Sequence, residues 1–122
     1  MSYEVIWEPR GVVKRYFGHV TDQELTQGVI ETEADARFDS LRYAINDFLA
    51  CESFAVTPAS AEEIAIMDRG ASCSNPYIRI AVVAVQPEII ALSQAYANSP
   101  LNVYPTRIFP TEREAREWIG KL

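Results

Sequence analysis

The chain has 122 residues, of which 48% are hydrophobic, so residues 1–122 are long enough to form one domain with a substantial core. Its formal charge of −6, from 11 basic and 17 acidic residues, would repel a phosphate backbone and argues against nucleic acid as a partner. The longest apolar run, residues 80–85, falls far short of the roughly 20 residues that a membrane span requires.

The N-terminus and the two cysteines indicate the compartment. The sequence MSYEVIWEP has neither the basic region nor the apolar region of an export signal, so we expect a cytoplasmic protein. Cys51 and Cys73 are too few for a disulfide framework and too far apart for a CxxC site, which predicts two reduced thiols. We find no metal, nucleophile or phosphate-binding motif, and we expect neither a cofactor nor catalytic activity.

The first segment predicts an antiparallel hairpin. Residues 3–8 alternate between two faces, as in a strand with one solvated side. Residues 8–11 form a turn, with Pro9 at its second position and Gly11 at its fourth, and residues 11–17 are the return strand.

The first helix is predicted from a capping box. Thr21 and Glu24 have the spacing at which each side chain satisfies the other's backbone amide. The helix that follows is expected to bury Leu25, Val29 and Ala36, and Asp39-Ser40 breaks it.

A third strand, a long loop and a second helix are predicted next. Residues 41–47 read as a strand with Leu41, Tyr43 and Ile45 on one face, and with Arg42 and Asn46 on the other. Residues 48–59 show no period and are expected to be the one long loop. A possible capping box at Ser60 and Glu63 begins a helix that ends by residues 74–76 and carries Ala61, Ile64, Ala65 and Asp68 at helical spacing.

The stretch YIRIAVVAV, residues 77–85, predicts the central strand. From Ile80 onward both alternating faces are apolar, which is typical of a parallel strand buried on both sides. A third helix begins at Gln86-Pro87-Glu88, presents Ile89, Leu92 and Tyr96 on one stripe, and ends at residues 98–100.

The C-terminal segment predicts an edge strand and a last helix. Pro105 removes a ladder donor from residues 103–109, which confines this strand to an edge. Thr111 and Glu114 form a third capping box, before a helix with Ala115, Trp118, Ile119 and Leu122 on one face. The order ββαβαβαβα predicts an α/β domain with a mixed, mostly parallel five-stranded sheet in a right-handed (βα) superhelix.

Several short pieces of the chain resemble a known family. They are the hairpin leading into residues 18–21, Asp47-Phe48, residues 80–83, residues 107–109, Glu114-Ala115 and Trp118-Ile119. They are similar to STAS-type proteins related to sporulation anti-anti-sigma factors, and more narrowly to the bacterial branch of STAS/SEC14 domain-containing proteins. The resemblance covers nearly the whole chain. It implies a small mixed sheet flanked by helices, and a module that binds a partner or a ligand rather than a catalyst.

The phosphorylation site of the signalling members has no full counterpart in this sequence. In those members a serine or threonine lies in an Asp-Ser-Ser-Gly-like stretch where the loop enters the second helix. The corresponding stretch here is Thr57-Pro58-Ala59-Ser60-Ala61, in which no glycine follows Ser60. Only Thr57 and Ser60 could replace the phosphorylated residue by position.

Five residues have two interpretations each. His19 is either a titrating group or a strand-end residue bonded to backbone, and Cys51 is either a reactive loop thiol or a packed one. Tyr43 and Trp118 either line an apolar ligand pocket or belong to the core. Ser60 is either a phosphorylation site or the N-cap of the second helix. We favour the structural interpretation in each case.

Ligands of parallel α/β sheets gather beyond the carboxyl ends of the strands, and the candidate binding residues are taken from that edge. The occupant is expected to be a protein partner or, alternatively, a small apolar or lipid-like ligand, as the SEC14 resemblance implies. The loop 48–59 is expected to decide between them by covering the core or lifting away from it. The candidate residues are His19, Thr21, Asn46, Asp47, Thr57, Ser60 and Gln86.

Overall fold

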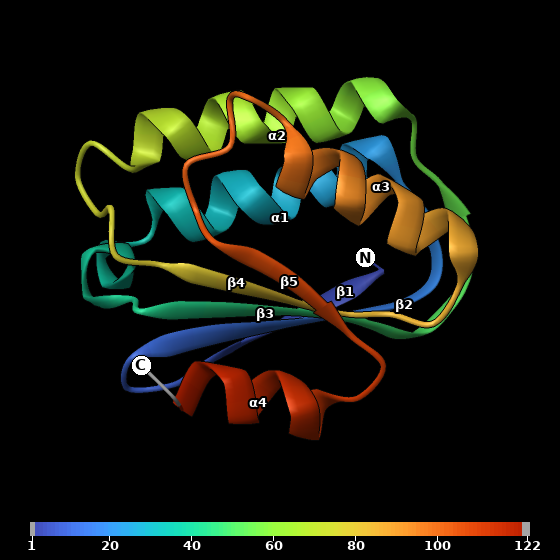
Figure 1. Ribbon diagram of the computed structural model, residues 1–122, viewed down its shortest axis with the longest axis horizontal. Coiled ribbons are helices and arrows are strands. Elements are labelled where there is room, and N and C mark those ends of the chain that lie inside the picture. Colours follow the sequence, from blue (N-terminus) through green and yellow to red (C-terminus); the bar gives the residue numbers. More distant parts are fainter. Residues whose placement is uncertain (1, 121–122) are drawn as a thin grey trace.

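The computed structural model describes residues 2–120, and its central feature is a mixed five-stranded sheet (Figure 1). The strands lie in the order β1-β2-β3-β4-β5; β1 is antiparallel to β2, and the other neighbours are parallel. This arrangement confirms the predicted α/β class and the order ββαβαβαβα. The strands are β1 (Tyr3–Trp7), β2 (Gly11–Thr21), β3 (Tyr43–Ala55), β4 (Arg79–Val83) and β5 (Thr106–Phe109).

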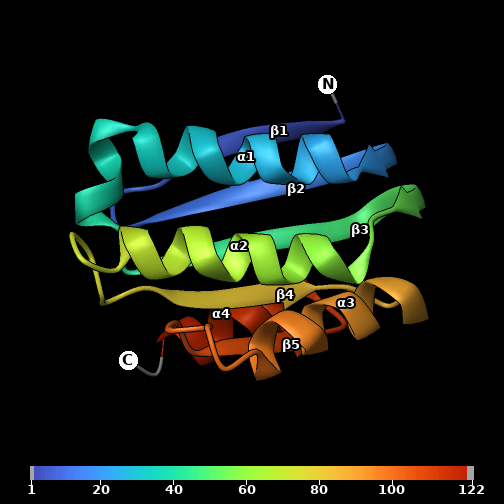
Figure 2. The same ribbon diagram turned by 90° about the horizontal axis from the view of Figure 1, so that it is seen from above.

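Four α-helices cover the two faces of the sheet. Helices α1 (Asp22–Ala34), α2 (Pro58–Ala71) and α3 (Pro87–Asn98) lie side by side on one face, and α4 (Glu112–Gly120) lies alone on the other (Figures 1 and 2). A short 3-10 turn (Ala36–Ser40) connects α1 to β3. Within residues 2–120, no helix has the length and apolar character needed to cross a membrane.

The N-terminal hairpin forms at the predicted turn. The amide of Glu8 donates to the carbonyl of Gly11 at 2.8 Å, and the reverse bond measures 3.4 Å. A Cβ atom on Gly11 would lie 2.1 Å from the ring of Tyr43, so glycine is required there by close packing. The turn therefore fixes the start of β2 directly beside the start of β3.

The prediction of a loop over residues 48–59 is wrong, because β3 continues to Ala55. Its extension pairs with a matching extension of β2, from Phe17 opposite Ala50 to Thr21 opposite Ala55. The register shifts twice along these extensions. Each irregularity changes which face the following side chains occupy, and this removes the period-two pattern that identifies a strand in a sequence.

The helix starts agree with the sequence more closely than the helix ends. Thr21 caps α1 by accepting from the amide of Glu24 at 3.3 Å, as predicted. The Glu24 carboxylate instead accepts from the amide of Ser2 at 2.8 Å. The helix ends at Ala34, before Asp39-Ser40, so the prediction that Ala36 is buried is wrong. In the last helix Leu122 lies outside the described residues.

The strand β4 is interior, parallel and buried, as predicted, but β3 holds the middle of the sheet. The predicted range 77–85 was too long at both ends, because Tyr77 and Val85 are exposed and lie outside the strand. The strand β5 lies at the edge, as predicted. It begins only at Thr106, so Pro105 precedes the strand.

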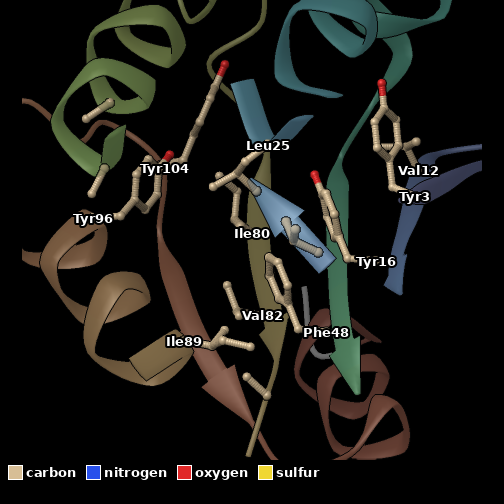
Figure 3. Packing of buried hydrophobic residues seen from close by; sticks show 14 of the residues in the cluster. Tyr3, Val12, Tyr16, Leu25, Phe48, Ile80, Val82, Ile89, Tyr96 and Tyr104 are labelled. Carbon is tan, nitrogen blue, oxygen red and sulfur yellow. The ribbon is translucent and has the colours of Figure 1, made fainter. Parts of the chain in front are cut away.

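The two faces of the sheet carry cores of different character. Under α1, α2 and α3 the core is large and aromatic: the rings of Tyr16 and Phe48 stack with centroids 4.6 Å apart (Figure 3). Under α4 the core is small and centred on Val13, Ile45 and Val83.

The predicted core residues Tyr43, Trp118 and Leu41 are divided between the two faces of the sheet. Tyr43 and Trp118 pack against the core under α4, which confirms their assignment as core residues. Leu41 was predicted to share a face with Tyr43 and Ile45, and this is wrong. Leu41 precedes the strand and packs in the core under the other three helices.

A charge network also holds α4 on the sheet. Arg116 pairs with Glu8 at 2.8 Å and with Glu112 at 3.3 Å, and Arg15 reaches Glu112 at 3.3 Å. The carboxylate of Glu112 therefore connects a strand to the helix, beyond its favourable place in the first helical turn.

We predict that Val83→Asp prevents stable folding. Val83 is fully buried and stands opposite Asp47 in the adjacent strand, so the substitution would place a second carboxylate beside a buried one. The cost is several kcal/mol, against a typical total stability of about 5 to 15 kcal/mol. Thermal melts beside Val85→Asp, at a position that is 58% exposed, provide the control. A cooperative, near-wild-type melt of the Val83 variant would contradict the assigned packing.

Candidate functional site

The structure brings three of the predicted site residues together at the carboxyl ends of β2 and β3. Thr21 ends β2, and the next residue, Asp22, begins α1. The Asp22 carboxylate accepts from the amide of Thr57 at 2.9 Å and from the hydroxyl of Ser60. These bonds, that of Ser60 first, lower the pKa of Asp22. Sequence reasoning missed Asp22, although its place directly after a helix cap was visible.

The prediction that Ser60 is an N-cap is wrong. Thr57 is the N-cap of α2, and Pro58 occupies the first helical position, for which its ring is preorganised. Ser60 therefore lies inside the first turn, is buried, and donates its hydroxyl to Asp22. Its role is to tie the start of α2 to the start of α1.

His19 and Gln86 each bond to the extension of β3. The ring Nδ1 of His19 lies 2.6 Å from the hydroxyl of Ser53, so its partner is a side chain and not the backbone that was expected. The Gln86 amide donates to the carbonyl of Cys51 at 2.6 Å. The thiol of Cys51 is buried and donates to the carbonyl of Ser53 at 3.2 Å. Burial raises the pKa of Cys51, which supports the packed-thiol interpretation.

Asn46 and Asp47 do not lie at this edge, contrary to the prediction. Because β3 continues to Ala55, both residues lie within the strand, and their side chains point to opposite faces. Asp47 lies on the face of α4, where burial raises the pKa of its carboxyl. Asn46 lies on the face of the other three helices, where it lines a cavity.

A mainly apolar cavity lies between the sheet and helices α1, α2 and α3. Its volume is about 100 Å³, and most of its lining is apolar. Figure 3 shows Leu25, Phe48 and Val82 around this space, from one helix and two strands. A water molecule occupies about 30 Å³ of liquid, so the cavity has room for more than one small group.

Polar side chains gather at one part of the lining. Lys14 of β2 is 5% exposed and stands directly opposite Asn46 of β3 in the parallel register. Helices contribute Glu33 from α1 and Asp68 from α2, and the Tyr96 hydroxyl of α3 donates to the Asp68 carboxylate. The cavity thus combines an apolar body with a polar end.

Burial shifts the acid–base behaviour of this polar end. The pKa of Lys14 is lowered by burial, which the nearby Asp68 carboxylate partly offsets. The pKa of Glu33 is raised to about 9, first by burial and then by Asp68, which bears the same charge. Burial also raises the pKa of Tyr96 far above its usual range. Burial therefore favours the neutral forms of Lys14, Glu33 and Tyr96.

The sequence reasoning missed this cavity. Its one direct signal was Lys14, which alternates with Val12 and Tyr16 on a strand face that is otherwise apolar. Within residues 2–120, the structure contains no group of three or more His, Cys, Asp or Glu side chains arranged to hold a metal ion.

We expect Glu33→Gln to change the pH dependence of stability. Because the pKa of Glu33 is raised above its ordinary value of 4.5, the folded state keeps a proton that the unfolded chain releases, and stability falls between pH 4.5 and about 9. The glutamine variant lacks this loss and should exceed the wild type by about 1 kcal/mol or more at pH 8, with no such gain at pH 4.

Urea unfolding at both pH values measures the effect, with the exposed Glu63→Gln as control. An equal change at both pH values would show that Glu33 is not perturbed in the folded protein.

Comparison with known proteins identifies the fold. No family model and no curated protein matches the sequence. Among solved structures, the anti-sigma factor antagonist SpoIIAA in its unphosphorylated form aligns with a TM-score of 0.65 at 13% identity, over 98% of this chain and 99% of that one. The phosphorylated SpoIIAA of Bacillus gives a TM-score of 0.63 at 14% identity, over 96% and 98%.

A third match is an uncharacterized protein of the DUF3478 family from Shewanella loihica PV-4, described as having a SpoIIAA-like fold. It aligns with a TM-score of 0.56 at 12% identity, over 96% of this chain and 91% of that one. These likenesses confirm at the level of the fold the resemblance to STAS-type domains, and the chain has the SpoIIAA-like fold.

Proposed function

We propose that this protein is a non-catalytic binding domain that holds a small, mainly apolar ligand in the cavity beneath α1, α2 and α3. The observation that carries the proposal is the cavity itself, about 100 Å³ in volume and lined mostly by apolar side chains. Small-molecule sites are typically concave and apolar, with a few polar groups that orient the ligand.

The volume limits the size of the ligand. An engineered apolar cavity of about 150 Å³ in another protein binds benzene, so a cavity of about 100 Å³ accepts a single ring only when the helices above it move slightly apart. A longer chain would have to part the helices. Of the lining residues, Glu33, Ile64 and Leu92 on the three helices are partly exposed, which makes the helical layer the route of entry.

The loop 48–59, which we expected to open or cover the core, does not exist as predicted. Residues 48–55 are paired strand rather than a loop that lifts away, so opening there would break ladder hydrogen bonds. Separation of α1 from α2 beyond their starts, which Asp22 holds together, breaks no ladder hydrogen bond of the sheet. We therefore place the opening step in the helices.

Toluene titration monitored by amide and methyl NMR tests the proposal. Shifts should be confined to residues that line the cavity. They should disappear in Ala61→Leu, which fills the cavity from α2, and persist in Ala59→Leu, at an exposed position of the same helix. Bound ligand should also raise the melting temperature of the wild type and of the control variant. Absence of shifts at millimolar toluene would contradict the proposal.

A cytoplasmic protein partner at the carboxyl-end edge is the second candidate. It is favoured by two large apolar side chains on the paired extensions of β2 and β3, since Phe17 is 43% exposed and Leu49 is 46% exposed. They lie close to His19 and Ser53 in the chain. A SpoIIAA-like fold also occurs in a protein described as an anti-sigma factor antagonist.

The double variant Phe17→Ser, Leu49→Ser separates the two candidates. A protein partner identified by cross-linking should bind this variant at least tenfold more weakly, while toluene binding stays unchanged. Ile66→Ser, at a position on α2 that is 55% exposed, is the matched control. Full partner affinity in the double variant would exclude this surface.

A further inference from the structure

Two polar groups at the same point of the cavity lack partners. Lys14 and Asn46 occupy opposite positions on adjacent parallel strands, which lie about 4.8 Å apart. Both side chains line the cavity. They belong to different strands, and only the register of β2 with β3 brings them together.

The lysine has an unused donor. Lys14 is 5% exposed, and no carboxylate of residues 2–120 forms an ion pair with its ammonium. No side chain or backbone carbonyl in this part of the chain accepts a hydrogen bond from it. An amine with so little accessible surface and no protein acceptor depends on water or on a bound group for its hydrogen bonds.

The asparagine has an unused acceptor. The side-chain oxygen Oδ1 of Asn46 is buried and has no hydrogen-bond donor within the described residues. Its backbone is paired with that of Lys14 in the parallel register, so the two side chains lie on the same face of the sheet. The two groups do not satisfy each other, so a third group that both accepts and donates is the matching complement.

The surrounding charges oppose an anionic ligand. The carboxylates of Asp68 and Glu31 act on Lys14, with Asp68 first, whereas the nearby Glu33 keeps its proton at pH 7. Tyr96 donates to Asp68, and Tyr3 donates to Glu31 at 2.9 Å. An added carboxylate or phosphate would meet the negative charges of Asp68 and Glu31 around a single amine, and it would be desolvated on entry.

We propose that Lys14 and Asn46 together bind the hydroxyl group of a small neutral ligand, such as an alcohol or a phenol. The ligand oxygen accepts from the Nζ of Lys14, and the ligand O–H donates to the Oδ1 of Asn46. The apolar remainder of the ligand lies against Phe48 and Val82. This inference rests on the proposed function and specifies the chemistry of the ligand.

One hydroxyl group fits this pair better than the alternatives do. An ether or a ketone accepts from Lys14 but leaves Asn46 without a donor, and a hydrocarbon leaves both groups unsatisfied. An ionised acid accepts twice and donates to neither group. Because a net hydrogen bond to a charged or strongly polar group contributes roughly a factor of ten in affinity, the preference should be measurable.

The experiment compares phenol, toluene and benzoate, which share one ring and differ in the head group. Dissociation constants are measured by NMR titration of the full chain at pH 7. We expect phenol to bind roughly tenfold more tightly than toluene, and benzoate to bind most weakly. In Lys14→Met, which keeps the length of the side chain, phenol should lose its advantage and toluene should bind at least as well as before.

The control is Arg15→Met, on the same strand but on the opposite face of the sheet, where all three affinities should remain unchanged. Asn46→Leu should also reduce the preference for phenol over toluene. Equal binding of phenol and toluene to the wild type would overturn the hydroxyl inference and leave the apolar cavity function standing. Tightest binding by benzoate would overturn it in favour of an anionic ligand, and absence of binding by all three compounds would overturn both proposals.

Discussion

The parallel pairing of β2 with β3 is the interaction on which the rest of the structure depends. It runs from Gly11 opposite Tyr43 to Thr21 opposite Ala55, which makes it the longest ladder in the sheet. Its amino end is fixed by the tight contact of Gly11 with the Tyr43 ring. Its carboxyl end sets where α1 and α2 begin, so that Asp22 can reach Thr57 and Ser60. Both candidate sites follow from this one register.

The two faces of the sheet differ in the size of their cores and in the polar groups that they bury. Under α4 the core is small and its fully buried members are aliphatic. The charges of Glu8, Glu112 and Arg116 remain at the rim of the helix, where solvent screens them. Under the other three helices the side chains are large and aromatic, and they leave a cavity. Asp47 is buried on the face of α4, whereas Lys14 and Asp68 are buried at the cavity, where a ligand could offset their cost.

A glycine in α1 allows this helix to pack closely over the cavity. Gly28 lies in the middle of this helix, where glycine costs about 1 kcal/mol relative to alanine. A Cβ atom there would lie 3.0 Å from the hydroxyl of Tyr16 and 3.7 Å from the side chain of Lys14. The glycine thus lets the helix approach the two strand residues that form part of the cavity wall. The close packing over the cavity offsets the free energy that glycine costs inside the helix.

The sequence by itself determined the class of the fold, because the responsible signals are local. The apolar faces of residues 80–83 required an interior strand. The cap at Thr21 and the first-turn proline Pro87 placed two helix starts correctly. Only the tertiary structure decided that residues 48–55 are strand, since their register shifts erase the periodic pattern and their partner lies in β2. Likewise, Lys14 and Asn46 meet because two strands pair in one register. A contact of that kind depends on backbone hydrogen bonds between distant segments, and no spacing along the chain encodes it.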